Sequence, residues 1–322
     1  MRAVTVRDTG GPEVLRLERH PETHPGAGEV AVDTAACGVN YIDIYQRRGL
    51  YPLPLPFVPG QEGAGVVTAV GAGVRDVRPG DRVAWADAQG SYAERTVLDA
   101  DRTVPVPAGL SFDAAAGVAL QGMTAHYLAH DAHRISDGHT VLVHAAAGGV
   151  GLLLVQLAKL RGAHVIGTVS TELKERAARA AGADHIVRYG TEDFAARARE
   201  LTGGTGVDAV YDGVGRATFD QSLECLRPRG CLVLYGQSSG PVPPVDPQRL
   251  NAAGSVFLTR PSLTHYLADR RELLARAADV FGWLESGRVT LSIDKVFTLA
   301  GARRAHVALE SRRTSGKILL RP

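Results

Sequence analysis

The chain has 322 residues, enough for two domains with cores of their own, and its formal net charge is only +2. Hydrophobic residues make up 45% and charged residues 22%, an ordinary globular composition. Lys and Arg form no basic block, which argues against a nucleic-acid partner. No apolar run approaches the roughly 18 residues that a membrane helix needs, so no membrane partner is expected.

The N-terminal third predicts short strands separated by Gly and Pro, at residues 4–7, 29–34, 63–70 and 81–84. Four prolines, at positions 52, 54, 56 and 59, exclude a helix there and predict a stiff extended loop. This region therefore predicts a compact β-barrel.

From about residue 123 the pattern changes, because strand-like runs now alternate with helix-length segments. The predicted strands are 140–145, 164–169, 185–187, 208–211 and 231–235. The predicted helices are 151–160, 172–181, 193–202 and 219–226. Such alternation indicates βαβ units and a doubly wound parallel sheet. The tail predicts a helix at 271–284 and a last strand at 317–320. We expect an α/β protein of two domains, one built from residues 1–123 and 262–322 and the other from 124–261.

Three cysteines, Cys37, Cys225 and Cys231, have the spacing of neither a disulfide framework nor a zinc cluster. They are interpreted as small buried apolar residues. The N-terminus has no apolar core or cleavage site of a secretion signal, so a cytoplasmic location is expected.

The strongest local motif is the run VLVHAAAGGVG at 141–151, a strand, a tight turn and a helix start. Ala146, Gly148 and Gly151 hold the three small positions of a dinucleotide-binding turn. Gly148 would let the backbone approach a pyrophosphate, and Gly151 would let the helix pack on the strand. Ala at the first position departs from the strict template, and a merely structural turn is the alternative.

The end of the next strand distinguishes NADPH from NAD. A carboxylate usually binds the ribose hydroxyls of NAD there, whereas this strand ends in Ser170 and Thr171, with Lys174 one turn later. Glu172 is the only nearby acid and lies beyond the expected position. Two hydroxyls and a cation suit a 2′-phosphate, which favours NADPH. In the alternative interpretation Ser170 or Thr171 only caps the helix and Lys174 is solvated; both can hold at once.

Together these residues resemble the quinone oxidoreductase (ζ-crystallin-like) family of the medium-chain dehydrogenase/reductase superfamily. The most specific stretches are 38–45, 49–54, 59–67, 144–151, 211–215, 259–262 and 310–312. The resemblance implies an N-terminal GroES-like barrel domain and a Rossmann domain. It also implies a homodimer, for which an exposed edge strand of the sheet could pair across a two-fold axis.

Zinc-dependent alcohol dehydrogenases of the same superfamily carry a Cys where this chain has Asn40 and a His where it has Gln61. Amides are poor zinc ligands, and the four-cysteine structural zinc lobe is absent, so no metal is expected. Without a Lewis acid, an acceptor that is already electrophilic is favoured, which points to a quinone reduced by positioning against the nicotinamide.

The resemblance also implies the site residues. Asn40, Tyr45 and Tyr51 would act on the acceptor, although Tyr41 or Tyr45 could instead pack in the barrel core. The implied cofactor-binding residues are Tyr41, Ile42, Tyr45, Tyr127, Gly148, Gly149, Val150, Gly151, Ser170, Thr171, Lys174, Tyr189, Gly213, Ser238, Ser239 and Arg312. Tyr189 would stack near the adenosine, and Lys174 and Arg312 would bracket the 2′-phosphate. Gly213 departs from the Ser of family members.

The proton for the reduced oxygen could come from a tyrosine or from water, so no essential acid or base is assigned. Gln121 and His126 are expected near the domain junction. Two other functions stay open: reduction of the C=C bond of an α,β-unsaturated carbonyl (an enal or enone), and a non-catalytic, NADPH-linked RNA-binding or structural role.

Overall fold

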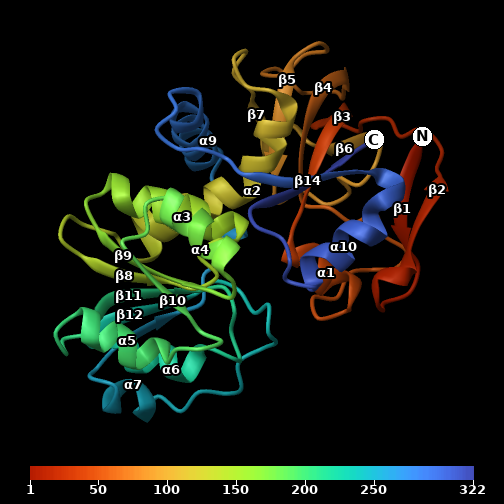
Figure 1. The fold of residues 1–322 in the computed structure, drawn as a ribbon. Coiled ribbons are helices and arrows are strands. Elements are labelled where there is room, and N and C mark those ends of the chain that lie inside the picture. Colours follow the sequence, from red (N-terminus) through yellow and green to blue (C-terminus); the bar gives the residue numbers. More distant parts are fainter. The chain divides into compact units, whose positions relative to one another are not determined.

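The computed structural model describes all 322 residues, and the chain forms two compact units. The first consists of Met1–Met123 and Tyr266–Pro322, and the second of Thr124–His265. Figure 1 colours the first unit red to yellow and blue, and the second mainly green to teal. The expected fold class, an α/β protein with a barrel-like part and a doubly wound sheet, is confirmed.

The first unit is built on a seven-stranded sheet. Its strands follow the order β14-β15-β3-β4-β5-β7, β6 pairs with β3, and β1 and β2 form a separate antiparallel pair. The strands are β1 (Arg2–Val6), β2 (Leu15–Arg19), β3 (Glu29–Val39), β4 (Glu62–Val70), β5 (Arg82–Ala86), β6 (Arg95–Asp99), β7 (Thr103–Pro105), β14 (Ile293–Thr298) and β15 (Lys317–Arg321). Buried apolar side chains of β3, β4 and β5 form a continuous core that includes Trp85.

The last strand of the chain returns to the middle of this sheet. β15 pairs antiparallel with β3, with Ile318 opposite Val39 and Leu320 opposite Cys37. Cys37 in turn lies opposite Gly63 of β4. This register brings together the end of β3, the start of β4 and the start of β15. Three segments that are distant in sequence therefore meet at the same end of the sheet.

The first unit also contains helices that the sequence patterns did not predict. Its helices are α1 (Tyr41–Arg47), most of α2 (Phe112–Tyr127), α9 (Arg270–Glu285) and α10 (Ala302–Glu310). Only α9 was predicted, one residue shorter at each end. Most residues of α2 are buried, so it lacks the polar face that reveals an amphipathic helix. A π-helical turn, Leu128–Ala132, follows it.

The second unit is a six-stranded, all-parallel sheet of order β10-β9-β8-β11-β12-β13. Its strands are β8 (Thr140–Val143), β9 (His164–Val169), β10 (His185–Arg188), β11 (Val207–Asp212), β12 (Leu226–Leu234) and β13 (Phe257–Thr259). Its helices are α3 (Gly149–Leu160), α4 (Glu172–Ala180), α5 (Phe194–Leu201), α6 (Phe219–Cys225), α7 (Gln248–Ala252) and α8 (Leu263–Tyr266), whose last residue belongs to the first unit. Figure 1 shows α3 and α4 on one face of the sheet and α5 and α6 on the other.

The strand order reverses between β8 and β11, which makes this the topological switch point where doubly wound sheets bind ligands. One boundary differs from the prediction, because β12 begins at Leu226 whereas a strand was expected only from residue 231. Because Pro228 disfavours a helix, α6 does not extend to it, and the chain is already in the extended conformation of β12 at this residue.

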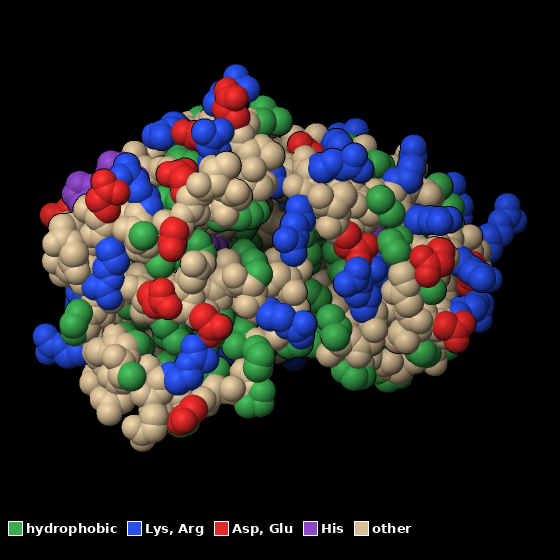
Figure 2. Space-filling model, turned by 60° about the horizontal axis from the view of Figure 1, so that its bottom comes forward, with side chains coloured by type: hydrophobic (Ala, Val, Ile, Leu, Met, Phe, Trp, Pro, Cys, Tyr) green, Lys and Arg blue, Asp and Glu red, His purple; other side chains and the backbone are tan.

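No helix of the structure is long and apolar enough to cross a membrane. On the face drawn in Figure 2, Lys and Arg side chains are interspersed with Asp and Glu, so neither sign of charge covers that face by itself.

Candidate active site

The glycine turn joins β8 to α3 and is closely packed at Gly151. Ala145 takes a left-handed conformation (φ 48°), and its carbonyl accepts a hydrogen bond from the Gly148 N–H at 2.8 Å. The Ala146 N–H donates to the Thr168 carbonyl of β9 at 3.0 Å. A Cβ atom on Gly151 would collide with the Ala145 carbonyl oxygen and lie 2.9 Å from the Ala146 backbone. Glycine is therefore needed at position 151 for α3 to pack against the turn.

Gly148 lacks a side chain for a different reason. A Cβ there would meet only the Ala145 carbonyl oxygen, at 3.1 Å, so no packing against protein explains the residue. Gly148 is the N-cap of α3, and the N–H groups of Gly149, Val150 and Gly151 occupy its first turn, where the helix supplies no acceptors. Such a helix start favours a bound anion. The turn fits the pyrophosphate of a dinucleotide.

At the end of β9 the expected hydroxyls and cation are present without a competing carboxylate. Ser170 is exposed, and Thr171 Oγ1 accepts the Lys174 N–H at 3.3 Å as the N-cap of α4. The Glu172 carboxylate lies 3.7 Å from the guanidinium of Arg176, and both side chains are exposed. The helix-capping interpretation thus holds for Thr171, whose hydroxyl contacts the backbone N–H of Lys174 and not its side chain.

Tyr189 follows β10 directly, and its ring is exposed. Its N–H donates to the Val169 carbonyl at the end of β9, at 3.3 Å. The neighbouring strand ends therefore bring Tyr189 close to Ser170, although 19 residues separate them in sequence.

Gly213 follows β11 and is covered by an aromatic ring. A Cβ there would lie 2.8 Å from the Tyr235 ring, so a serine at this position would require that ring to move. The Gly213 carbonyl accepts from the Ser238 N–H at 3.2 Å. Glycine in place of the family's serine at position 213 thus leaves room for the ring of Tyr235, which follows β12.

Ser239 ties the same two loops together through its side chain. Its hydroxyl donates to the Val214 carbonyl at 2.7 Å and accepts from the Ala217 N–H at 3.0 Å. The Ser239 hydroxyl thus holds the two loops together.

A buried network that the sequence motifs did not reveal fixes three strand ends. The His144 ring lies between Thr168 Oγ1 and Ser222 Oγ, each at 2.9 Å. Asp212 Oδ2 accepts from Ser222 Oγ at 3.3 Å and from Thr218 Oγ1 at 2.7 Å. Burial lowers the pKa of His144, which keeps the ring neutral. The only signal in the sequence was a histidine ending an apolar strand.

Tyr127 ends α2 and is buried, and His126 beside it stacks on His130 with ring centroids 4.3 Å apart.

Apart from Tyr127, the cofactor residues predicted in the second unit all lie at the carboxyl ends of its strands. That is the edge where doubly wound sheets bind nucleotides.

In the first unit, Asn40 lies at the centre of a buried polar cluster. Its Nδ2 donates to Glu62 Oε1 at 2.6 Å, and its Oδ1 accepts from Lys317 Nζ at 2.9 Å and from Gln121 Nε2 at 3.1 Å. Lys317 Nζ also pairs with Glu62 Oε1, and both side chains are completely inaccessible to solvent. Glu62 Oε2 accepts from the Leu120 N–H of α2 at 2.7 Å. We call Asn40, Glu62, Gln121 and Lys317 the Asn40 cluster.

The residues at the superfamily's zinc-ligand positions do not fit a zinc ion. Asn40 offers an amide that is already bound by the Lys317 ammonium, a cation that would repel Zn²⁺. Gln61, the other position, donates from Nε2 to Gln89 Oε1 at 2.6 Å. Nowhere in the 322 residues do three or more His, Cys, Asp or Glu side chains gather in a way that could hold a metal ion.

Three tyrosines of α1 and the following loop lie side by side. The rings of Tyr41 and Tyr45 have centroids 6.0 Å apart, and Tyr45 and Tyr51 meet edge to face at 5.3 Å. Tyr45 is buried, whereas Tyr41, Ile42 and Tyr51 are partly exposed. Two of the predicted acceptor residues, Tyr45 and Tyr51, are thus brought together by α1 and the turn that follows it.

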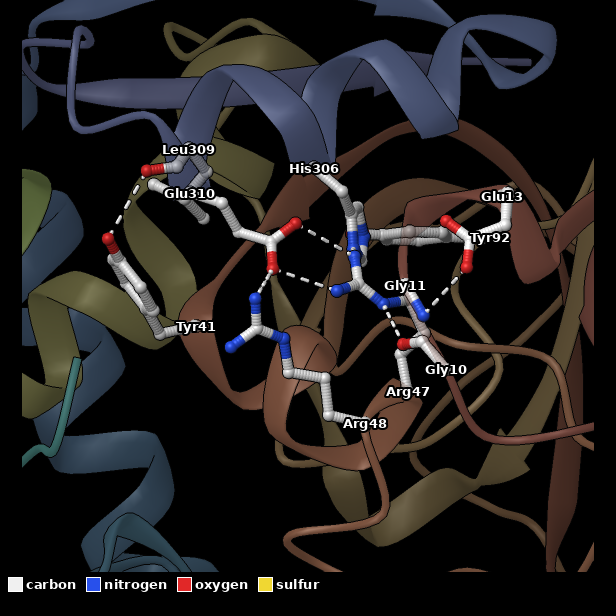
Figure 3. A network of polar contacts seen from close by, with 10 residues as sticks. All are labelled: Gly10, Gly11, Glu13, Tyr41, Arg47, Arg48, Tyr92, His306, Leu309 and Glu310. Atoms are coloured by element: carbon white, nitrogen blue, oxygen red, sulfur yellow. Dashed lines mark hydrogen bonds and ion pairs between the residues drawn. The ribbon is translucent and has the colours of Figure 1, made fainter. Parts of the chain in front are cut away.

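Tyr41 is anchored to the C-terminal end of α10. Its hydroxyl donates to the Leu309 carbonyl at 3.2 Å (Figure 3). Burial raises the pKa of Tyr41, and the Arg312 guanidinium opposes that rise. Arg312 is exposed and follows α10 in a left-handed conformation (φ 55°), which turns the chain toward β15.

Behind α1, a buried arginine connects this helix to α10. Arg47 NH2 donates to Glu310 Oε1 at 2.8 Å, NH1 lies 3.1 Å from His306 Nδ1, and Nε donates to the Gly10 carbonyl at 3.1 Å (Figure 3). Tyr92 links His306 to Asp43 of α1. These contacts fix the helix that carries Tyr41 and Tyr45.

Comparison with known proteins agrees with this architecture. The family "Alcohol dehydrogenase GroES-like domain" matches residues 26–140, and "Zinc-binding dehydrogenase" matches 149–278. The quinone oxidoreductase of Pseudomonas aeruginosa is 45% identical, covering 97% of each chain. The 2-haloacrylate reductase of a Burkholderia species is 42% identical, over 99% of this chain and 98% of its own. A mycobacterial protein solved in complex with NADPH is 51% identical, with a TM-score of 0.98 over the whole of both chains.

A GroES-like barrel joined to a doubly wound sheet, with a glycine turn at the switch point, defines a medium-chain dehydrogenase/reductase. Within that superfamily the full-length identities are decisive. The chain belongs to the quinone oxidoreductase family.

Proposed function

We propose that this protein is an NADPH-dependent quinone reductase that works without a metal. The observation that carries the proposal is the Asn40 cluster, where an amide held by a buried ammonium takes the place of metal ligands. Such a site offers hydrogen bonds to an acceptor oxygen but no strong Lewis acid. That suits a quinone, which is electrophilic already and becomes aromatic on reduction.

The cofactor assignment rests on residues of the second unit. The N-terminus of α3, with Gly148 open beside it, suits the pyrophosphate, and Ser170 with Lys174 suits the 2′-phosphate. NADPH, when bound, supplies the hydride. We include Tyr189, which follows β10 and is exposed, as the residue beside the adenosine.

The remaining work of the protein is to bind and orient the acceptor. Asn40 retains one amide N–H beyond the one given to Glu62, and the rings of Tyr45 and Tyr51 meet edge to face with centroids 5.3 Å apart. We propose that these three residues bind a quinone oxygen and that the two tyrosine rings exclude water. Catalysis is then mainly by positioning.

The deciding test follows NADPH oxidation at 340 nm with a panel of quinones and a panel of enals, with NADH as the control cofactor. We expect turnover of quinones with NADPH well above turnover with NADH. Turnover of enals with no turnover of any quinone would assign the protein to C=C reduction, the chemistry that the name 2-haloacrylate reductase implies for a relative. Equal use of NADH would contradict the phosphate site.

We further propose that the protein is a homodimer of the cytoplasm. β13 is the last strand of the second unit's sheet, and Phe257 on it is 64% exposed, a surface suited to pairing with a second copy. Light scattering should give twice the chain mass, and Phe257→Asp should shift the measured mass toward that of a single chain.

The cytoplasmic location is supported by the three cysteines, which are free and buried and so suit a reducing compartment; cell fractionation tests this.

A further inference from the structure

The buried ion pair of the Asn40 cluster fixes the orientation of two amides. An ammonium has only donors, so the Asn40 atom facing Lys317 must be Oδ1. A carboxylate has only acceptors, so the Asn40 atom facing Glu62 must be Nδ2. Because Oδ1 then accepts from Gln121, the Gln121 atom facing it must be Nε2, and Gln121 Oε1 points away. The polarity set by the charges thus passes through Asn40 to Gln121.

This arrangement leaves unused hydrogen-bonding capacity at two neighbouring positions. Gln121 Oε1 is buried and has no hydrogen-bond partner, although the side chain is only 9% exposed. Asn40 Nδ2 carries a second hydrogen besides the one donated to Glu62. A buried polar atom without a partner is rare and points to a missing ligand. The cluster therefore holds an unused donor hydrogen on Asn40 and an unused acceptor on Gln121, two residues that are themselves joined by a hydrogen bond of 3.1 Å.

The fold accepts a considerable cost to build this cluster. Two fully buried charges lose their hydration, and an apolar pair of similar size is often at least as stable. Gly38 is also required, because a Cβ there would collide with Glu62 Oε1 and lie 2.6 Å from Lys317 Cε. Stability alone does not account for this arrangement, whereas a functional need to fix the orientation of the Asn40 and Gln121 amides does.

We propose that Asn40 and Gln121 form a matched donor and acceptor for the hydroxyl of the reduced acceptor, held in that polarity by Lys317 and Glu62 as positioning residues. The inference rests on the proposed quinone reduction. Reduction adds one hydride (two electrons and one hydrogen nucleus) and one proton, which water supplies as it becomes hydroxide, and the two C=O groups of the quinone become two C–OH groups. A quinone oxygen has only lone pairs, so of this pair it can use the Asn40 N–H but not Gln121 Oε1. Once the oxygen carries hydrogen, it can also donate to Gln121 Oε1.

The pair would then bind the reduced form more tightly than the oxidised one. An interaction that appears only as the reaction proceeds raises kcat rather than lowering KM for the quinone. Gln121 thus distinguishes two forms of one molecule that differ by a single hydrogen at this oxygen.

The test uses the complete enzyme, 1,4-naphthoquinone as substrate and 1,4-naphthalenediol as product inhibitor, under anaerobic conditions. Gln121→Met keeps the volume and removes the acceptor. We expect the inhibition constant of the diol to rise about tenfold, the effect of one lost hydrogen bond, and kcat to fall by a similar factor. KM for the quinone should change less than about threefold.

Two further variants separate this role from a structural one. Lys317→Met/Glu62→Gln removes both charges and should raise the diol inhibition constant as Gln121→Met does. Adding Gln121→Met to it should have little further effect, because the residues act as one unit. Gln46→Met is the matched control, because Gln46 Oε1 is also buried and without a hydrogen-bond partner; only the stability of this variant should change.

An unchanged diol inhibition constant in Gln121→Met, with normal quinone turnover by the wild type, would overturn the inference alone. Independent, additive effects of Gln121 and the ion pair would also overturn it. Absence of quinone turnover by the wild type would instead refute the proposed function and this inference with it.

Discussion

The guanidinium of Arg47 lies 3.1 Å from Nδ1 of His306, and both side chains are completely buried. Because a guanidinium only donates, Nδ1 must accept, and the ring proton is on Nε2. Nε2 lies 3.1 Å from the Tyr92 hydroxyl, which donates to Asp43 Oδ2 at 2.8 Å. The donors therefore all point from Arg47 toward Asp43. Burial, with Arg47 close by, lowers the pKa of His306 to about 3, and burial raises that of Asp43 to about 7.

This network predicts opposite pH dependences of stability for two single variants. The lowered pKa of His306 means that the unfolded chain binds its proton first, so His306 alone makes stability fall as pH drops from 6.5 toward 3. The raised pKa of Asp43 means that the folded chain keeps its proton longer, so Asp43 alone makes stability rise as pH drops from 7 toward 4. Each pKa unit is worth about 1.4 kcal/mol, so the two effects largely cancel between pH 4 and 6.5.

Denaturant unfolding at pH 5 and pH 7 measures these contributions. Asp43→Asn should be less stable at pH 5 than at pH 7, because only the His306 term remains. His306→Phe should be more stable at pH 5 than at pH 7. Slopes of the same sign in both variants would show that these two groups do not carry the pH dependence. Gln46→Met, on the same helix and without a titrating group, should keep the wild-type profile.

The cofactor preference should depend on a single cation of α4. Lys174→Ala should raise KM for NADPH about tenfold and leave KM for NADH nearly unchanged, because only NADPH carries the 2′-phosphate. Arg176→Ala is the matched control, since Arg176 lies on the same helix but its guanidinium is directed to Glu172 at 3.7 Å. An equal rise for both cofactors in Lys174→Ala would remove this lysine from the phosphate site.

Much of the fold could be predicted because its signals are local. The strands of the parallel sheet are short apolar runs buried on both faces, and α4 and α9 begin with Thr171 and Asp269, good N-cap residues. α1 and α2 escaped prediction for physical reasons. α1 has only seven residues, and α2 is buried along most of its length, so neither shows helical periodicity.

The candidate site divides in the same way. The glycine turn is a contiguous motif, so its role could be predicted from spacing and context. The Asn40 cluster could not, because Lys317 and Glu62 are 255 residues apart in sequence and meet only through the register of β15 with β3. From sequence alone, a lysine at the start of an apolar strand is expected to be exposed to solvent, and only the three-dimensional neighbours of Lys317 show that it is buried. The unpartnered oxygen of Gln121 likewise follows only from three-dimensional contacts.

The two glycines of the turn should respond differently to the same substitution. Gly151→Ala places a methyl group against the Ala145 carbonyl and should destabilise the protein by about 1–3 kcal/mol. Gly148→Ala has ordinary backbone angles (φ −78°) and one close contact at 3.1 Å, so it should cost less than about 1 kcal/mol. Its methyl group would instead meet the cofactor, and NADPH affinity should fall at least tenfold. Unfolding and fluorescence titration measure the two effects; unchanged NADPH binding in Gly148→Ala would contradict a pyrophosphate there.

Metal independence gives the last prediction, and it can be tested by attempting to build a zinc site. Metal analysis of the purified protein should find no stoichiometric zinc, and dialysis against a chelator should leave quinone reduction unchanged. The Asn40→Cys/Gln61→His variant restores two ligand types, yet it should still not bind zinc tightly. The Lys317 ammonium, 2.9 Å from the Asn40 side chain and paired with Glu62, would remain beside any ion bound there. Removing that charge as well, with Lys317→Met added, should be required before zinc binds. Stoichiometric zinc in the wild type, or tight zinc binding with Lys317 in place, would show that the buried lysine is not what excludes the metal.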